Sequence, residues 1–373
     1  MAGSIHKYQT KKGETRYMVM LEVGNNGKRK QKKKMGFKTK KEANTFLIEA
    51  LNDINKGTYI EPSRILFSEF LEEWFKTKQI SLGTQTKSVH KNYLYKYIIP
   101  SLGHIPLSQL KTIHINNFIN EMNQRKYSPA TIKKAVNIIK NSLEFGIDIE
   151  MINKNVAKKA TLPKEIKNEM KVWNQEEVNK FLKVAKGSRY YPFFYLALMT
   201  GMRKGEILAL RWKDIDLENM LLTINQTLTQ DGKEFIAGAK TKASNRTMDL
   251  SESTVKILKA HKVLIQQEKL ALGKDYVNHD LVICTQIGTP VHSSNLRNRV
   301  FNQLIKEAEV SKIRLHDLRH THATLLLSVG VNVKVISERL GHSSIKITLD
   351  TYSHVLPTMQ KEAVKKLDDM LTL

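Results

Sequence analysis

The chain has 373 residues and carries 61 Lys and Arg against 36 Asp and Glu, a formal net charge of +25. This length exceeds that of one ordinary domain, so two or three domains are expected. An excess of positive charge this large is typical of a protein whose partner carries phosphates, because such binding releases counterions. A basic but otherwise ordinary enzyme is the alternative.

Membrane and disulfide classes are not favoured by the sequence. No apolar run of about 18 residues is present and the first residues lack the core of a signal peptide, so a soluble, cytoplasmic protein is expected. The single cysteine, Cys284, cannot form a disulfide within one chain, and its apolar surroundings predict a packed thiol.

Residues 1–57 have the pattern of a small α+β domain. Arg16 to Val23 is predicted to be a strand, Asn26-Gly27 is typical of a hairpin turn, and Lys28 to Met35 is the expected return strand. A capping-box pattern at Thr39 and Glu42 begins a helix. Its apolar positions have helical spacing: Ala43, Phe46, Leu47 and Ala50. We expect a three-stranded sheet backed by one helix.

The returning strand is also the most basic part of the chain. Residues 1–57 hold 14 Lys and Arg against 5 Asp and Glu, and like charges this dense repel one another without a counter-charge. A solvated surface is the ordinary interpretation of any single lysine. For the cluster as a whole we predict DNA binding, through Lys28, Arg29, Lys30, Lys32, Lys33 and Lys34.

Residues 57–64 resemble a linker, and residues 65–155 are predicted to be an all-α bundle of four or five helices. The expected helices lie at Phe67–Phe75, Thr86–Tyr97 with a stop at Pro100-Ser101-Leu102-Gly103, His114–Asn123, and Pro129–Phe145 with Ser128 as N-cap.

A polar stretch, Lys158 to Lys171, is predicted to be a second linker, and a mainly-α mixed α+β domain follows over residues 172–373. Its first expected elements are helices at Gln175–Ala185, Pro192–Met199 and Arg203–Trp212 and strands at Leu221–Leu228 and Arg246–Leu250.

The most informative stretch runs from Arg314 to His354. His316 and Arg319, three residues apart, share one face of a helix, His342 follows a Leu-Gly turn, and Tyr352 lies near the end. Two imidazoles, a guanidinium and a phenol suit a phosphate that is attacked by a tyrosine.

Two further segments add cations. Arg203 follows a glycine turn at a helix start, where backbone amides favour an anion, and Glu206 lies one turn on. Lys240 or Lys242 lies at the tip of a basic hairpin. Taken alone, the first is an ordinary surface ion pair and the second a solvated hairpin.

No P-loop, H-E-x-x-H or C-x-x-C pattern is present, so no nucleotide, metal or other cofactor is expected. His316 and His320 have a helical i, i+4 spacing with His322 nearby, but they lack an acidic ligand motif. We interpret His320 and His322 as packing or supporting groups.

With these motifs, the chain resembles the tyrosine recombinases, and more narrowly the integrases of temperate phages and of integrative conjugative elements from Gram-positive bacteria. The resemblance extends over essentially the whole length of the chain. T-G-M-R-K-G-E is similar to the family's first arginine box, and H-D-L-R-H-T-H-A with L-G-H-S-S-I-K-I-T-L-D-T-Y-S-H to its second. The resemblance implies catalytic roles for Arg203, His316, Arg319, His342 and the nucleophile Tyr352, with Lys240 as the lysine and Lys242 as the weaker candidate.

The resemblance also implies an arm-type DNA-binding domain over residues 1–57, a SAM-like core-binding domain over 65–155 and a catalytic domain over 172–373. The implied partners are double-stranded attachment sites with core and arm sequences, three further protomers in a synaptic tetramer, an excisionase and a DNA-bending host factor. The amphipathic tail, Leu356 to Leu373, packs on its own protomer or on a neighbour.

The chemistry agrees with this resemblance. A phenol with a pKa of about 10 needs help to lose its proton, and His316 is the candidate general base. Arg203 and Arg319 can clamp the phosphate oxygens, with His342 as a further donor, and Lys240 can protonate the leaving 5′-oxygen. The product is a 3′-phosphotyrosyl link, so rejoining needs neither ATP nor metal.

Two other functions are kept as alternatives. Asn332 to Ile347 has the pattern of a helix-turn-helix with its turn at Gly341, which would suit a DNA-binding regulator without catalysis. A type IB topoisomerase shares the tyrosine nucleophile but does not exchange DNA partners.

Overall fold

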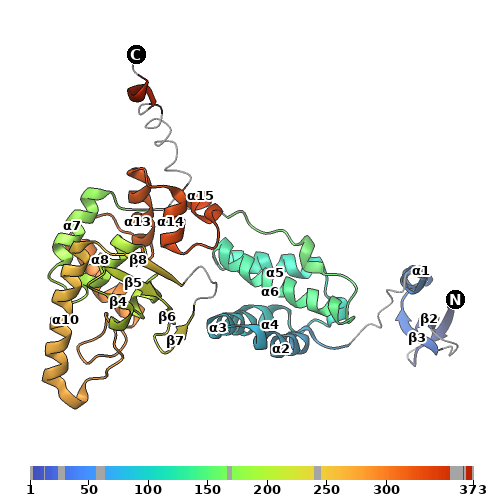
Figure 1. Cartoon of the computed structure of the whole chain (residues 1–373). Coiled ribbons are helices and arrows are strands. Elements are labelled where there is room, and N and C mark those ends of the chain that lie inside the picture. Colours follow the sequence, from blue (N-terminus) through green and yellow to red (C-terminus); the bar gives the residue numbers. More distant parts are fainter. Residues whose placement is uncertain are drawn as a thin grey trace. The chain divides into compact units, whose positions relative to one another are not determined.

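The computed structural model describes residues 3–11, 13–23, 30–55, 64–165, 170–238, 245–352, 364 and 367–371 (Figure 1). The chain forms two compact units, Met1–Lys167 and Asn168–Leu373. Among these described residues, no helix is long and apolar enough to cross a membrane.

The first unit begins with an antiparallel sheet in the order β1 (Gly3–Gln9), β2 (Thr15–Val23) and β3 (Lys30–Phe37), followed by α1 (Lys40–Asn55). The helix covers one face of the sheet, and Val19 and Leu21 of β2 are buried with Ala43, Leu47 and Ala50 of α1. The expected sheet and helix are confirmed, whereas the predicted turn at Asn26-Gly27 lies outside the described residues.

The predicted start of α1 is also confirmed. The amide of Glu42 donates to Oγ1 of Thr39 at 3.1 Å, and the amide of Thr39 donates to Oε2 of Glu42 at 3.4 Å. This reciprocal capping box satisfies two amides that the first helical turn cannot pair within the helix.

The lysines of β3 do not share one face of the sheet. Lys32 and Lys34 lie opposite Leu21 and Val19, on the face that α1 covers, because paired residues of an antiparallel ladder point to the same side. The ammonium of Lys34 lies 4.1 Å from the ring centroid of Phe46 in α1, and burial lowers its pKa. Lys33, opposite Met20, belongs to the open face.

Lys30 pairs with Val23 at the end of the ladder, and Lys28 and Arg29 lie outside the described residues.

The rest of the first unit is helical, as predicted. Its main helices are α2 (Phe67–Lys78), α3 (Thr84–Tyr93), α4 (Ile99–Leu102), α5 (Thr112–Gln124) and α6 (Pro129–Asp148). Short 3-10 turns lie at Gln79–Ser81, Leu107–Gln109 and Val156–Lys159. Ser128 caps α6 as predicted, since its Oγ accepts from the amide of Thr131 at 3.2 Å.

The helical path ends within Pro100-Ser101-Leu102-Gly103, as predicted, but it is not one continuous α-helix. A π-helical turn at Leu94–Ile98 joins α3 to α4, and the helical path continues to Leu102. The amide of Ile99 bonds to the carbonyl of Leu94, five residues back. Pro100 therefore stands in the first turn of the new α-helical segment, where a missing N–H costs no hydrogen bond.

The predicted linker over Lys158 to Lys171 starts later than expected. Lys158 and Lys159 belong to a 3-10 turn, and the amide of Thr161 donates to Oδ1 of Asn116 in α5 at 3.1 Å. Residues 56–63 and 166–169 of the two predicted linkers lie outside the described residues.

The second unit is mainly helical around a small sheet. Its helices are α7 (Gln175–Ala185), α8 (Tyr191–Thr200), α9 (Lys204–Leu208), α10 (Glu252–Leu272), α11 (Ser293–Asn295), α12 (Asn302–Glu307), α13 (Asp317–Ser328), α14 (Val333–Leu340) and α15 (Ile345–Tyr352), with a π-helical turn at Leu296–Phe301 and 3-10 turns at Trp212–Asp214 and Gly273–Asp275. Strands β4 (Ile215–Asp216), β5 (Leu221–Ile224) and β8 (Arg246–Asp249) form one sheet in that order, and β6 (Gln226–Leu228) pairs with β7 (Phe235–Ala237).

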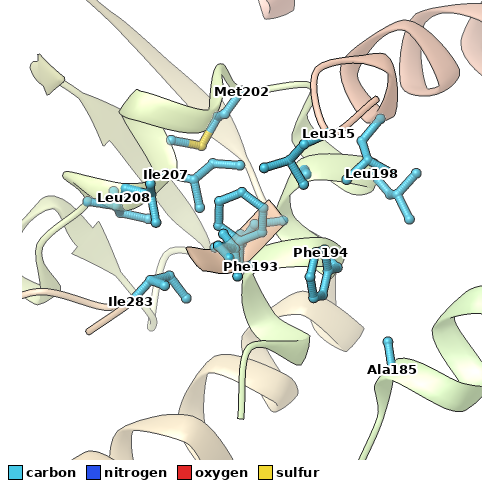
Figure 2. Close-up of a cluster of buried hydrophobic side chains, with 14 of the residues drawn as sticks. Ala185, Phe193, Phe194, Leu198, Met202, Ile207, Leu208, Ile283 and Leu315 are labelled. Carbon is cyan, nitrogen blue, oxygen red and sulfur yellow. The ribbon is translucent and has the colours of Figure 1, made fainter. Parts of the chain in front are cut away.

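The core of this unit centres on α8, whose sequence is apolar on all sides. Phe193 and Phe194 are fully buried and pack with Ile207, Ile283 and Leu315 (Figure 2). Cys284 is buried as predicted, with its sulfur 3.6 Å from the hydroxyl of Tyr276.

The predicted helix Arg203–Trp212 is too long, because α9 ends at Leu208. The carbonyl of Leu210 accepts from the amide of Val282, and the amide of Trp212 donates to the carbonyl of Asp280. These bonds to a distant segment take the backbone groups that a longer helix would use. The predicted strand Leu221–Leu228 is likewise divided at Asn225, between β5 and β6.

Candidate active site

The residues predicted for catalysis come from three places in the second unit. Arg203 lies between α8 and α9, and His316 and Arg319 lie at the start of α13. His342 precedes α15, and Tyr352 is its last residue. Helix α13 contacts both α8 and α14, which brings these segments together.

Two glycines in the left-handed conformation shape the turns beside them. Gly201 ends α8 at a φ of 65°, and a Cβ there would lie 2.5 Å from the ring of His322. Gly341 ends α14 at a φ of 63°, as predicted for a helix end.

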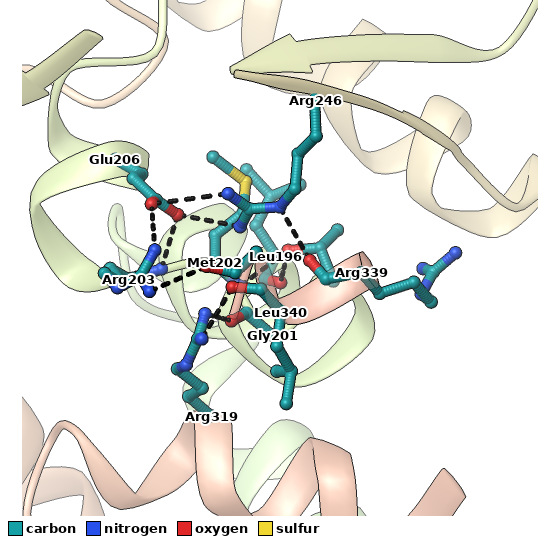
Figure 3. A network of polar contacts seen from close by, with 11 residues as sticks. Leu196, Gly201, Met202, Arg203, Glu206, Arg246, Arg319, Arg339 and Leu340 are labelled. Atoms are coloured by element: carbon teal, nitrogen blue, oxygen red, sulfur yellow. Dashed lines mark hydrogen bonds and ion pairs between the residues drawn. The ribbon is translucent and has the colours of Figure 1, made fainter. Parts of the chain in front are cut away.

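Arg319 is held by these two turns. It is 4% exposed, and its Nη1 donates to the carbonyl of Gly201 at 2.7 Å while Nη2 donates to the carbonyl of Leu340 at 2.6 Å (Figure 3). Burial lowers the pKa of Arg319 to about 9, with the charge of Arg203 as a further cause. The group is therefore still a cation at neutral pH.

Arg203 belongs to a second set of contacts, centred on the buried carboxylate of Glu206. Its Nη1 donates to Oε1 of Glu206 at 2.8 Å and its Nη2 to the carbonyl of Gly341 at 3.1 Å. Arg246, from β8, donates to Oε2 of Glu206 at 2.9 Å, and its Nε donates to the carbonyl of Arg339 at 2.7 Å (Figure 3). The predicted pairing of Arg203 with Glu206 is confirmed.

Arg246 was not predicted. It lies 40 positions after Glu206, and a basic residue in a strand after a basic hairpin gives no sequence signal that it turns inward.

His342 is fixed by a contact with α15. Its Nδ1 and the hydroxyl of the buried Thr348 are hydrogen bonded at 2.8 Å. Burial and the charges of Arg319 and Arg203 lower the pKa of His342 to about 4, so the ring is neutral at pH 7. With Nδ1 engaged, Nε2 is the atom that can donate to a phosphate oxygen.

Tyr352 is 1% exposed and packs among Ala323, Leu327, Ile336 and Leu340. Its hydroxyl is hydrogen bonded at 2.8 Å to Nδ1 of His320, and burial raises the pKa of the phenol to about 12.

His316 has no hydrogen bond to Tyr352 within the part of the chain that the structure describes. Its exposed ring lies T-shaped against that of His320, with centroids 5.0 Å apart.

The contacts of His320 and His322 agree with their interpretation as packing or supporting groups. His322 is a packing group, since it is 4% exposed and its Nδ1 is bonded to the carbonyl of Leu198 at 2.7 Å. His320 instead contacts Tyr352 directly. Among the described residues, no group of three or more His, Cys, Asp or Glu could hold a metal ion.

Five of the six predicted catalytic residues thus gather in one site, Arg203, His316, Arg319, His342 and Tyr352. Lys240 and the alternative Lys242 lie outside the described residues, between β7 and β8. Guanidinium groups and neutral imidazoles beside a phenol suit phosphoryl transfer to a tyrosine.

Three family models match the chain. The Phage integrase family model covers residues 171–359, the model of an arm DNA-binding domain covers residues 4–54, and that of a phage integrase N-terminal SAM-like domain covers residues 66–123.

The relatives agree with these matches. A "Tyrosine recombinase XerC-like" of Caldanaerobacter subterraneus is 32% identical, over 96% of this chain and 97% of its own length. The ICEBs1 integrase of Bacillus subtilis is 34% identical, over 64% of this chain and 66% of its own length.

Solved structures show the same fold. The Tn1549 transposon integrase in complex with transposon right end DNA has a TM-score of 0.69 at 20% identity, over 81% of this chain and 99% of that one. A lambda integrase dimer bound to a core site has a TM-score of 0.60 at 18% identity, over 93% of this chain and 94% of that one.

The fold and the site define an enzyme that breaks and rejoins DNA. The chain belongs to the phage integrase family, and it is a tyrosine recombinase that catalyses site-specific DNA recombination. The predicted resemblance is therefore confirmed. Helices α14 and α15 do flank a turn at Gly341, whose carbonyl accepts a hydrogen bond from Arg203. Membership of the tyrosine recombinases favours catalysis over the alternative of a regulator without catalysis.

Proposed function

We propose that this recombinase integrates and excises a prophage or an integrative conjugative element through a 3′-phosphotyrosyl intermediate on Tyr352. The observation that carries the proposal is the phenol of Tyr352 in one site with Arg319, which is fixed by two backbone carbonyls, and with neutral imidazoles. The enzyme works in the bacterial cytoplasm, where its DNA substrate lies.

The residues divide the reaction among them. Arg203 and Arg319 clamp the non-bridging oxygens, and His342 donates from Nε2, which stabilises the charge that develops on the phosphorane. His316, with its exposed ring, contacts the phosphate from the open side of the site. Lys240, which lies outside the described residues, gives a proton to the leaving 5′-oxygen.

The domains divide DNA recognition. Residues 1–57 bind arm sites, residues 65–155 bind the core site, and residues 172–373 carry out catalysis. The matches to an arm DNA-binding domain and to a SAM-like domain support this division.

Assembly follows from the chemistry of strand exchange, which needs one nucleophile for each of four strands. Lambda integrase, which shares this fold, has been solved as a tetramer bound to a Holliday junction. We propose a homotetramer on two synapsed attachment sites, with an excisionase and a DNA-bending host factor that set the direction.

The central test is covalent trapping on a nicked attachment-site duplex, with chelator present and without ATP. The wild-type chain forms a protein–DNA band on a denaturing gel, and Tyr352→Phe forms none while it still binds the duplex. Tyr195→Phe is the matched control, because it removes a hydroxyl that bonds to Ser253 in the same unit. Loss of the band only in Tyr195→Phe, or a band in Tyr352→Phe, contradicts the assignment. Relaxation of a supercoiled plasmid without recombination of paired sites would instead indicate a topoisomerase.

Because successive lysines of β3 lie on opposite faces of the sheet, we expect them to contribute unequally to arm-site binding. Lys33→Ala reduces the slope of log affinity against log salt by about 0.9, the value for one phosphate contact, because Lys33 lies on the open face of the sheet. Lys34→Ala changes the slope less, since the Lys34 ammonium lies over Phe46. Fluorescence anisotropy on an arm-site duplex measures both. Equal slopes for the two variants would show that the face of β3 does not decide DNA contact.

A further inference from the structure

Helix α13 and the residue before it present three imidazoles, and only one of them touches the nucleophile. His322 bonds to a backbone carbonyl, and among the described residues His316 shows a ring contact with His320 and no hydrogen bond to Tyr352. The hydroxyl of Tyr352 is bonded to Nδ1 of His320, at 2.8 Å. A general base must lie within hydrogen-bond reach of the proton that it removes, and His320 meets this condition.

The surroundings keep His320 neutral. Its pKa is lowered to about 4 by burial and by the neighbouring His316, Arg319 and Arg314, with Asp317 acting in the opposite sense. A neutral imidazole with its proton on Nε2 has an acceptor lone pair at Nδ1, which faces the phenol. His320 is therefore ready to accept a proton.

We propose that His320 accepts the proton of Tyr352 while the tyrosine attacks the phosphate. This inference rests on the proposed role of Tyr352 as nucleophile. The O–H bond of the phenol breaks, its electron pair forms the O–P bond, and the proton moves to Nδ1 of His320. The P–O5′ bond breaks, and the 5′-oxygen takes a proton from Lys240. The expectation that His316 is the base is replaced, and His316 keeps its proposed contact with the phosphate.

The bound substrate supplies the driving force that the empty site lacks. Without DNA, the cations Arg319 and Arg314 disfavour an imidazolium at His320, so the phenol keeps its proton. A phosphodiester between Arg203 and Arg319 brings one negative charge, and the phosphorane brings a second. Because these charges lie in the same site, they offset the cations at the moment of attack and raise the proton affinity of His320.

The test is single-turnover cleavage of the nicked duplex by the full chain at saturating concentration. His320→Ala lowers the cleavage rate about 100-fold, the lower end of the range for a lost general base, and binds the duplex with unchanged affinity. Added imidazole restores the rate in proportion to the concentration of its neutral form. His320→Asn keeps a polar group near the position of Nδ1 but cannot take a proton, so it stays slow. Wild-type speed in His320→Asn would reduce His320 to a positioning residue and overturn the proposal.

A second substrate separates this step from leaving-group protonation. A duplex with sulfur in place of the bridging 5′-oxygen has a leaving group that needs no acid, so Lys240→Ala recovers on it and His320→Ala does not. Recovery of both variants would place His320 on the leaving-group side and overturn the proposal.

Controls separate folding and nucleophile identity from this inference. His320→Gln fills the space of the ring, so it is slow and gains nothing from imidazole, and DNA affinity reports whether each variant is folded. A wild-type chain that forms no Tyr352-dependent band contradicts the proposed function. A wild-type chain that cleaves normally, beside a His320→Ala variant within about three-fold of its rate, contradicts only the inference.

Discussion

Arg319→Lys will lower the rate of covalent cleavage about 10²- to 10³-fold, the usual effect of one lost donor to a developing oxyanion. The guanidinium of Arg319 bridges the carbonyls of Gly201 and Leu340, which end two different helices, and is 4% exposed. A lysine ammonium is a compact point charge that cannot span both carbonyls and also present paired N–H groups to a phosphate. In Arg319→Lys one of the two buried carbonyls would lose its hydrogen-bond donor, and the phosphate would lose the paired N–H groups of the guanidinium.

The measurement is single-turnover cleavage of the nicked attachment-site duplex, with binding followed separately. Arg314→Lys is the matched control, because Arg314 lies just before the same helix, α13, but its side chain is 76% exposed and pairs with Asp317. We expect the control to cleave within about three-fold of wild type, because lysine keeps an exposed cation that can still pair with Asp317. Cleavage by Arg319→Lys within ten-fold of wild type would show that a point charge is sufficient.

The sequence predicted much of the local structure because its signals are local. The capping box at Thr39, the Ser128 cap and the glycine at position 341 each act within one helical turn, and all three are confirmed. The helix end at Trp212 was wrong, since hydrogen bonds to residues 280–282 end the helix earlier. Those partners cannot be read from the spacing of residues along the chain.

The same distinction applies to the site. Arg203 and Glu206 are three positions apart, and their pairing follows from the local geometry of a helix start, because Arg203 is the N-cap of α9 and Glu206 lies in its first turn. The contact between His320 and Tyr352 joins α13 to α15, and that between Arg246 and Glu206 joins β8 to α9. Both need the tertiary fold, and neither could be predicted from sequence. Motifs therefore indicate which residues react, whereas packing decides which neighbour each of them touches.

The carboxylate of Glu206 is predicted to be the most sensitive single group for the stability of the second unit. It is 5% exposed and accepts hydrogen bonds from both Arg203 and Arg246. Glu206→Gln leaves two arginines without their shared anion, and the loss of one partner from a buried ion pair costs about 3–5 kcal/mol. At about 2–4 °C per kcal/mol for a domain of this size, the melting temperature falls by on the order of 10 °C.

This loss depends on pH in a defined direction. Burial alone would raise the pKa of Glu206, but the hydrogen bond and charge of Arg246, followed by those of Arg203, lower it overall. A carboxyl group with a lowered pKa stabilises the fold above its unfolded pKa of about 4.3 and ceases to do so as the pH falls through its folded pKa. The difference between wild type and Glu206→Gln is therefore largest at neutral pH and shrinks in acid.

Calorimetry of the full chain at pH 7 and near pH 4 measures both the size and the direction of this effect. Glu307→Gln is the control, since Glu307 is exposed in the same unit and accepts a single hydrogen bond from Gln303. Its melting temperature should change by about 1 °C or less, in line with a surface substitution. If Glu206→Gln and the control have the same melting temperature at pH 7, the two arginines find other partners. The carboxylate then does not hold the phosphate-binding cations in place.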